Sequence, residues 1–246
     1  MNIGFIGFGK VNQTLAKKLI KNHTLYASTE NRSTNTKKAI KKQKIKELPK
    51  DTDLIKNCEL IISANTPKNA IKTASKFKNK YKGLYLDLNN INPETTLKIE
   101  QILNENFIDG AIIGNIKNLE LLILAGPSAK KLEFFNNFIK TEIISEKTGD
   151  ASKIKMLRSI YTKGLSALLI ETTQAAKKLN MENQLWTILE TTENKDFKTI
   201  NKSRINNTEK NKTRKIEEIK ELNEFLEDIN TSQTMTKSTY KKFKEL

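Results

Sequence analysis

The sequence has one cysteine, one histidine and no long apolar run, and each scarcity excludes a class of protein. The single cysteine, Cys58, cannot form an internal disulfide or a cysteine zinc site, and it fits a reducing compartment. The single histidine, His23, excludes any site that needs two imidazoles. No apolar run approaches the roughly 20 residues that a membrane helix requires, and no basic leader precedes the first run. We therefore expect a soluble, cytoplasmic chain without a metal site.

Acidic residues are outnumbered by basic ones. The 246 residues include 44 Lys and Arg but only 28 Asp and Glu, which gives a net charge of +16. Clustered cations would bind a nucleic acid, yet these lysines are spread over the whole chain with few aromatic residues nearby. We interpret them as solvated helix faces and expect neither a nucleic-acid nor a membrane partner. Arginine, whose planar fork suits phosphate and carboxylate, is rarer; it occurs at Arg32, Arg158, Arg204 and Arg214.

Short apolar runs alternate with polar helical stretches over roughly the first 147 residues. This alternation predicts βαβ units and an α/β fold with a largely parallel sheet. The runs are nearly continuous, as burial on both faces of such a sheet requires. The predicted strands cover residues 2–7, 24–29, 59–65, 83–89, 107–114, 120–126 and 142–146.

The pattern changes at Gly149. Residues 151–179 contain no proline, and their apolar residues are spaced by three and four, which predicts one long helix. At about 1.5 Å per residue it would measure about 40 Å, more than its own lobe needs, so we expect it to pack against a partner subunit or the other domain. Residues 193–215 are too polar for a core and predict loops or exposed helix ends. Helical periodicity returns from Ile216 to Leu226, which predicts further helices.

The stretch GFGKVN follows the first predicted strand and begins a helix, which is the context of a GxGxxG phosphate loop. Gly7 permits the tight turn, and Gly9 lets the backbone approach a pyrophosphate at the helix N-terminus. Asn12 stands where a third glycine would serve helix packing, at a cost of roughly 1 to 3 kcal/mol. We therefore expect the loop to bind a nucleotide. Its remaining residues are Phe8, Lys10 and Val11.

The second predicted strand ends in STENRST, where a dinucleotide-binding fold places the adenosine ribose. Glu30 would suit the 2′-hydroxyl of NAD. Arg32 and Ser33 form a donor cluster that suits the 2′-phosphate of NADP, and one charge-assisted contact contributes about 1.5 to 3 kcal/mol. We therefore expect NADP rather than NAD as the cofactor.

Six motifs then occur in one order: GFIGFGKV, ENRS, TPKNA after ELIISAN, YLDLNNINPETT, FIDGAIIG and GDASKIKMLRSIYTKGLSALLIE. Together they resemble the β-hydroxyacid dehydrogenase superfamily, and more narrowly its phosphogluconate dehydrogenase-like branch, which carries a C-terminal domain of unassigned function. The resemblance covers most of residues 1–180. It implies an NADP-binding Rossmann domain at 1–148 and an all-helical substrate and dimerisation domain at 149–246. It also implies a homodimer and an active site in the cleft between the two domains.

The same resemblance implies roles for individual residues. The proton-transfer lysine of the family matches Lys155. Its substrate-carboxylate loop, a serine and two glycines in the hydroxyacid enzymes, matches Ile113, Gly114 and Asn115. Its asparagine one turn after the lysine matches Arg158 or Ser159. At the carboxylate loop and at the asparagine position, this sequence differs from the family, and both positions serve substrate recognition in the family. The cofactor-lining turns match Asn65, Thr66, Pro67 and Asn89.

Lys155, Arg158 and Ser159 are spaced so that they share one face of a helix. A lysine whose pKa is lowered by burial and by cationic neighbours can act as a general acid or base near neutral pH. Arg158 would also hold an anionic substrate, whereas Lys153 lies off this face. We therefore expect an NADP-dependent oxidoreductase that interconverts a hydroxyl and a carbonyl on a small, anionic metabolite. Two alternatives stay open: an imine or cofactor reductase in which Lys155 is dispensable, and a non-catalytic NADP-sensing protein.

Overall fold

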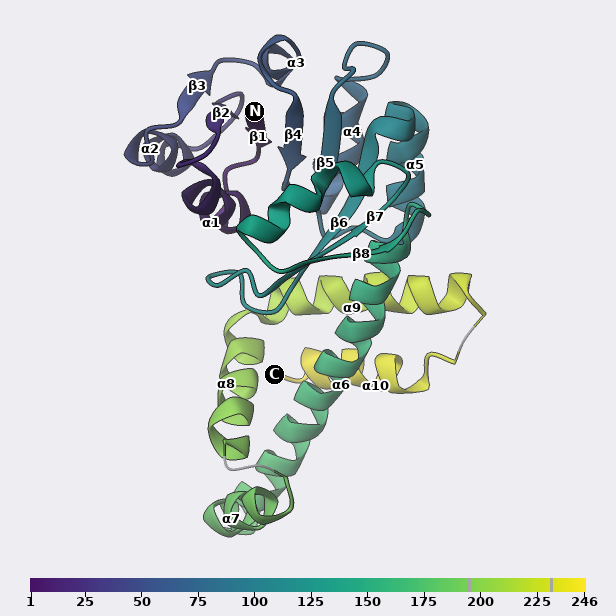
Figure 1. Cartoon of the computed structure of the whole chain (residues 1–246). Coiled ribbons are helices and arrows are strands. Elements are labelled where there is room, and N and C mark those ends of the chain that lie inside the picture. Colours follow the sequence, from purple (N-terminus) through teal and green to yellow (C-terminus); the bar gives the residue numbers. More distant parts are fainter. Residues whose placement is uncertain (194–195, 231) are drawn as a thin grey trace. The chain divides into compact units, whose positions relative to one another are not determined.

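A computed structural model describes residues 1–193, 196–230 and 232–246 of the chain. The chain separates into two compact units, Met1–Lys155 and Met156–Leu246 (Figure 1). The boundary lies inside one continuous helix, α6 (Asp150–Lys178). The sequence-based boundary at residue 148 precedes this helix. In the described part of the chain, no helix combines the length and the apolar character needed to cross a membrane.

The first unit is built on one eight-stranded sheet with the strand order β3-β2-β1-β4-β5-β6-β7-β8. Neighbouring strands are parallel except β6 and β7, which are antiparallel. The predicted α/β fold is therefore confirmed, and every predicted strand is present. The strands are β1 (Asn2–Ile6), β2 (Thr24–Ser28), β3 (Lys46–Leu48), β4 (Leu60–Ser63), β5 (Leu84–Asp87), β6 (Phe107–Ile113), β7 (Leu121–Ala125) and β8 (Thr141–Ser145).

The sequence does not predict β3, the short strand at one edge of the sheet. Its three residues, KEL, are exposed or half-buried. An edge strand of this kind lacks the continuous apolar run by which the other strands are found.

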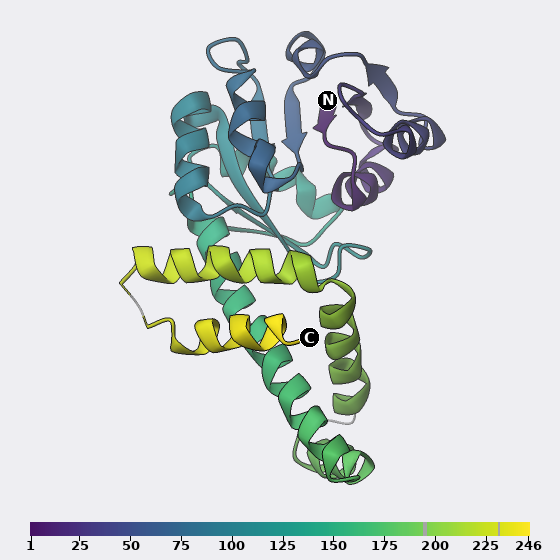
Figure 2. The same ribbon diagram turned by 180° about the vertical axis from the view of Figure 1, so that it is seen from behind.

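Helices and short 3₁₀ turns cover both faces of the sheet (Figures 1 and 2). α5 begins with Pro93 in its first turn, and the Asn92 side chain accepts a hydrogen bond of 2.8 Å from the backbone N–H of Thr95. The helices are α1 (Lys10–Leu19), α2 (Thr34–Lys42), α3 (Leu54–Asn57), α4 (Ala70–Ser75) and α5 (Pro93–Leu103). The 3₁₀ turns are η1 (Asp51–Asp53), η2 (Pro67–Asn69), η3 (Asn104–Asn106) and η4 (Ala129–Asn137).

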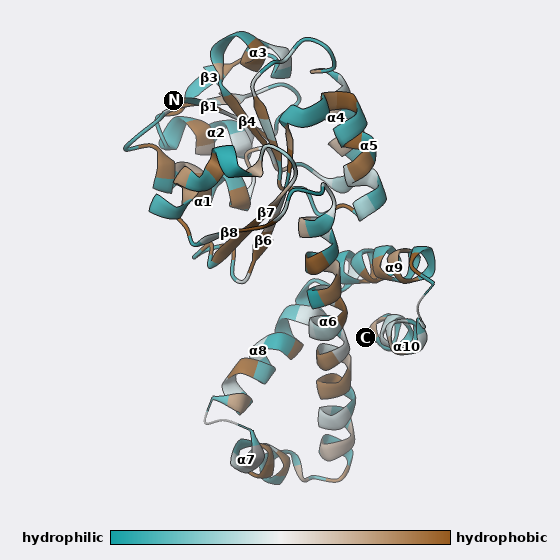
Figure 3. Cartoon of the chain, turned by 45° about the vertical axis from the view of Figure 1, so that its right-hand side comes forward, coloured by the Kyte–Doolittle hydropathy of each residue, from teal (hydrophilic) through white to brown (hydrophobic). Residues whose placement is uncertain are grey.

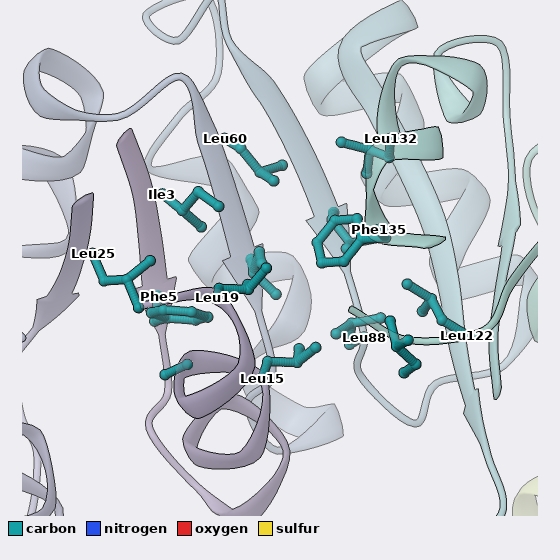
Figure 4. Packing of buried hydrophobic residues seen from close by; sticks show 14 of the residues in the cluster. Ile3, Phe5, Leu15, Leu19, Leu25, Leu60, Leu88, Leu122, Leu132 and Phe135 are labelled. Atoms are coloured by element: carbon teal, nitrogen blue, oxygen red, sulfur yellow. The ribbon is translucent and has the colours of Figure 1, made fainter. Parts of the chain in front are cut away.

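Alternate strand residues supply two cores, one on each face of the sheet. Ile3 and Phe5 of β1 pack with Leu15 and Leu19 of α1 in the larger cluster (Figure 4). Ile6 points the other way and joins the second cluster. Complete burial of one such side chain contributes about 1.5 to 3 kcal/mol. This packing fixes the strand ends, from which the loops of the candidate site begin.

The regular structure of the second unit is helical throughout its described residues. α9 buries the periodic residues that the sequence singles out, namely Ile219, Leu222, Phe225 and Leu226. They pack with Met156, Ala167 and Ile170 of α6 and with Phe243 of α10. Besides the continuation of α6, the helices are α7 (Glu182–Thr192), α8 (Phe197–Lys210), α9 (Lys212–Asp228) and α10 (Thr234–Lys244).

The prediction of loops or exposed helix ends over 193–215 is wrong for most of this stretch, because α8 occupies it. Residues 194 and 195 lie outside the described residues. The helix has no apolar stripe and is missed for that reason. It instead buries the polar residues Asn201 and Thr208, whose side chains bond to Arg204 of the same helix. Arg204 itself is half-buried.

The apolar residues that predict α6 lie mainly on a face that the chain itself leaves uncovered. Leu157, Tyr161 and Leu168 are 49%, 68% and 62% exposed. Apolar residues recur along the whole length of this helix (Figure 3). α6 therefore has one face packed against α9 and α10 and a second apolar face in contact with solvent.

Candidate functional site

The residues singled out in the first unit follow parallel strands. The loop from Gly7 follows β1, Glu30 and Arg32 follow β2, Asn65 follows β4, and Asn89 follows β5. Parallel strands bring their carboxyl ends to one edge of a sheet, so these segments meet there. Successive strands lead in opposite directions from β1, with β2 on one side and β4 on the other. Such a switch point opens the crevice in which α/β proteins bind ligands.

The two glycines after β1 serve different purposes. Gly7 has φ +76°, and a Cβ atom placed on it would lie 2.4 Å from the carbonyl oxygen of Ala64, so the turn requires glycine. A Cβ atom on Gly9 would meet no atom within 4 Å. The open space at Gly9 adjoins the N-terminus of α1, where backbone N–H groups favour an anion. This geometry fits a pyrophosphate.

The other loop residues contribute mainly to packing. The Phe8 side chain is buried and packs edge-on against Phe5, with ring centroids 5.7 Å apart, so only its backbone is available to a ligand. Val11 packs against the larger core cluster, whereas Lys10 is exposed.

Asn12 fills the place of the third glycine without opening the loop. Its side chain is fully buried, and its Nδ2 donates a hydrogen bond of 2.5 Å to the carbonyl oxygen of Gly7. A longer contact of 3.4 Å reaches the carbonyl of Ile6. The amide therefore braces the turn that precedes Gly9, and the departure from GxGxxG leaves the phosphate loop intact.

Four charged side chains form a cluster after β2. Lys76, the residue that follows α4, lies with its Nζ 2.9 Å from Glu30 Oε1 and 2.7 Å from Asp51 Oδ2. The other oxygen of Glu30 accepts a hydrogen bond of 2.7 Å from the backbone N–H of Asp51. The bond from Asp51, followed by that from Lys76, lowers the pKa of Glu30. Arg32 completes the cluster, with its Nη2 3.7 Å from Asp51 Oδ1.

A polar cavity of about 160 Å³ adjoins this cluster. Arg32 and Lys72 supply cations to its wall, and the Nε atom of Arg32 is buried without a hydrogen-bond partner. Ser33 caps α2 by accepting a hydrogen bond of 3.3 Å from the N–H of Thr36. The sequence did not indicate Lys76 or Asp51, because they meet Glu30 only through contacts between distant segments.

The turns after β4 and β5 are joined by one asparagine. The backbone N–H of Asn65 donates to Asn89 Oδ1. Asn89 in turn donates to Asp87 from its backbone N–H (2.8 Å) and from its side chain (2.7 Å). Because Asn89 is 4% exposed, it supports the turn that carries Asn65 and presents little surface to a ligand. Thr66 and Pro67 are exposed beside it.

Lys155 is the last residue of the first unit and is half-buried in the second turn of α6. Burial raises the pKa of the Asp87 carboxyl group to about 7 and also raises that of Asp109, and the charge of Lys155 opposes the rise in both. The sequence analysis missed both aspartates. The available signal was a charged residue inside an otherwise apolar run, in YLDLN and FIDGA.

The four predicted substrate residues are divided between the two units: Gly114 and Asn115 belong to the first, Arg158 and Ser159 to the second. Gly114 has φ +88°, and Asn115 accepts a hydrogen bond of 2.9 Å from the N–H of Lys117, so both build the turn after β6. Arg158 and Ser159 belong to the second unit, where Arg158 is exposed and Ser159 is half-buried. Lys153 is exposed and paired with Asp150 at 2.9 Å. Within the described residues, no three His, Cys, Asp or Glu side chains are placed to hold a metal ion.

Comparison with known proteins places these features in a family context. Residues 2–90 match the family described as NADP oxidoreductase, coenzyme F420-dependent. The chain is 40% identical over 248 residues to an uncharacterised 28.5 kDa protein from the 7S RNA 5′ region of Methanothermus fervidus, covering 100% of this chain and 99% of that protein.

Solved structures agree with this match. A conserved protein of unknown function, described as structurally similar to 3-hydroxyacid dehydrogenases, is 34% identical with a TM-score of 0.83, covering 100% of this chain and 96% of that one. The 3-hydroxyisobutyrate dehydrogenase of Mycobacterium tuberculosis has the same fold at 11% identity, with a TM-score of 0.81 and coverage of 99% and 92%.

Lys76→Gln is expected to lower the free energy of unfolding by about 1 to 3 kcal/mol at pH 7, because it leaves the buried Asp51 carboxylate without its closest cation. The lowered pKa of Glu30 adds a pH dependence. Its stabilising contribution is present above its ordinary pKa of 4.5 and is lost as the pH falls through the lowered value. The difference between wild type and variant should therefore shrink in acid. Urea unfolding at several pH values measures it, with the exposed Lys72→Gln as control. Equal stability of wild type and Lys76→Gln at pH 7 would contradict the assignment.

Proposed function

Because the chain belongs to the β-hydroxyacid dehydrogenase-like superfamily, we propose that it is an NADP-dependent oxidoreductase acting on a small, anionic hydroxy or oxo metabolite. The observation that carries the proposal lies within the first unit. The open space at Gly9 follows β1, and Lys155 lies three residues after Ser152, which donates hydrogen bonds to Asp109 beside the carboxyl end of β5 in the same sheet. A dinucleotide site and a proton carrier at one edge are the minimum that hydride transfer to or from a carbonyl requires.

The residues present fit a dinucleotide. The backbone from Gly7 to Gly9 and the N-terminus of α1 would hold the pyrophosphate, and the exposed turn at Thr66 and Pro67 would line the cofactor. The bound cofactor supplies or accepts the hydride. Lys155 then gives a proton to the carbonyl oxygen during reduction, or takes it from the hydroxyl during oxidation.

The charge cluster after β2 supports NADP over NAD. Both carboxylate oxygens of Glu30 already accept hydrogen bonds, from Lys76 and from the Asp51 N–H, so this acid is engaged away from a ribose 2′-hydroxyl. Arg32, by contrast, has a buried Nε without a partner at the wall of a polar cavity. A 2′-phosphate would accept from it and from Ser33.

Substrate recognition departs from that of the hydroxyacid enzymes that the sequence resembles. Gly114 and Asn115 serve the turn after β6, and no serine stands before them. We propose that Arg158, assisted by Ser159, binds the anionic group of the substrate instead. A guanidinium binds a carboxylate through two parallel hydrogen bonds, which fixes the orientation as well as the position of the ligand.

Arg32→Gln is expected to weaken NADPH binding by about 10- to 100-fold, because one charge-assisted contact contributes about 1.5 to 3 kcal/mol. Its affinity for NADH should stay within about two-fold of wild type, since NADH has no 2′-phosphate to lose a contact. Isothermal titration calorimetry of the folded variant measures both, with the exposed Lys38→Gln of α2 as control. Equal binding of NADPH and NADH by the wild type would refute the NADP preference.

Lys155→Ala separates the enzyme from its alternatives. For a dehydrogenase with this proton carrier, we expect turnover in a screen of small hydroxyacids to fall by at least about 100-fold while NADPH affinity is retained. The exposed neighbour Lys153→Ala should leave turnover unchanged. Undiminished activity of Lys155→Ala would favour an imine or cofactor reductase, and NADPH binding by a wild type without turnover would favour a sensor.

The uncovered apolar face of α6 supports the proposed homodimer, with a second copy of the chain as the occupant. Leu157, Tyr161 and Leu168 expose much of their apolar surface, which a soluble monomer rarely leaves together on one element. Light scattering should give a dimer mass for the wild type and a monomer mass for Leu168→Glu. The exposed polar position Gln174→Glu is the control. A monomeric wild type would rule out this assembly.

A further inference from the structure

Two buried aspartates lie side by side in the sheet. Asp87, the last residue of β5, is the register partner of Asp109 in the parallel strand β6. Register partners on neighbouring strands project from the same face of a sheet. Each residue is 2% exposed. Two adjacent carboxylates in a buried setting repel each other and lose hydration, so their charge requires compensation from neighbouring groups.

The two aspartates hold two different segments of the proposed site. Asp87 accepts two hydrogen bonds from Asn89, which accepts in turn from the backbone of Asn65 in the turn after β4. Asp109 accepts from the backbone N–H of Ser152 (2.9 Å) and from its hydroxyl (2.7 Å). The pair therefore connects the turn assigned to the cofactor with the first turn of α6.

The helix that Asp109 fastens is the one that carries Lys155. Ser152 and Lys155 are three residues apart, so their side chains project from one face of α6. Burial raises the pKa of both aspartates, and the charge of Lys155 opposes this rise in each. Tyr85 is a further buried titratable group beside Asp87, and its phenol is neutral because burial raises its pKa. The local charge is thus set mainly by two carboxyl groups and one ammonium.

We propose that Asp87 and Asp109 are positioning residues for Lys155. Together they hold its side chain at the carboxyl edge of the sheet and favour its ammonium form, so that it is charged and ready to donate a proton. The proposal rests on the proposed function only in using Lys155 as the proton carrier. It also gives the aspartates a purpose beyond fastening the helix, since a fastening role needs only their hydrogen bonds and not their negative charge.

Competitive acylation of lysines with acetic anhydride, followed by mass spectrometry, tests this proposal without substrate or cofactor. Only the free amine reacts, so the carboxylates should slow the acylation of Lys155 relative to the exposed Lys153 in the same helix. The reaction is run at pH 9, above the raised Asp87 pKa of about 7, so that this carboxyl group is ionised. Asp109→Asn and Asp87→Asn should then each raise the relative rate of Lys155 by about 10-fold, since loss of a neighbouring opposite charge changes such an equilibrium by at least that factor.

Ser152→Ala is the matched control, because it removes one hydrogen bond to Asp109 and leaves both carboxyl groups in place. It should lower the unfolding midpoint without changing the acylation ratio, whereas a purely structural role predicts that it acts like Asp109→Asn. Circular dichroism confirms folding, and the two aspartate variants provide independent tests if one fails to fold. An unchanged Lys155 ratio in a folded aspartate variant would overturn the proposal. Failure of the proposed function is seen separately, as undiminished turnover of Lys155→Ala.

Discussion

The parallel direction of the central strands is the constraint on which the candidate site depends. Because the carboxyl ends of β1, β2, β4 and β5 meet at one edge, the loops that follow them meet there as well. Segments as distant in sequence as Gly7 and Asn89 are brought to the same edge by the pairing of these strands. The cores on both faces of the sheet then fix the strand ends to which these loops are attached.

The charged groups buried at this edge all have partners that offset their charge. Asp51, Asp87 and Asp109 are each at most 3% exposed, and each is reached by a cation, by donated hydrogen bonds or by both. Such groups are costly to leave unpaired in a protein interior, which is why they occur here in linked sets. These hydrogen bonds and ion pairs also restrict movement within the site, because the partner of each side chain is itself fixed by a further contact. Rigid placement of polar groups is a requirement of sites that stabilise developing charge.

The fold was largely predictable from the sequence, because periodicity and apolar runs report which residues are buried. The strands, the long helix and the glycine loop all follow from such local signals. β3 and α8 were not predicted, because β3 is a short, exposed edge strand and α8 buries polar side chains. The partners of Glu30 were not predicted for another reason: Lys76 is 46 residues away in the sequence, and no local pattern specifies a contact at that separation. The roles of Lys155, Arg158 and Ser159 come from resemblance and stay predictions.

The engagement of Glu30 changes how an acid at the end of a second strand is interpreted. A carboxylate at this position is commonly taken as a sign of NAD, yet here each of its oxygens already accepts a hydrogen bond, one from a lysine and the other from a backbone amide. What matters is therefore the acceptor capacity that remains and not the identity of the residue. Redesign of this chain toward NAD would not begin by introducing an acid, because one is already present. It would have to release that acid from Lys76 and give the buried Asp51 another donor.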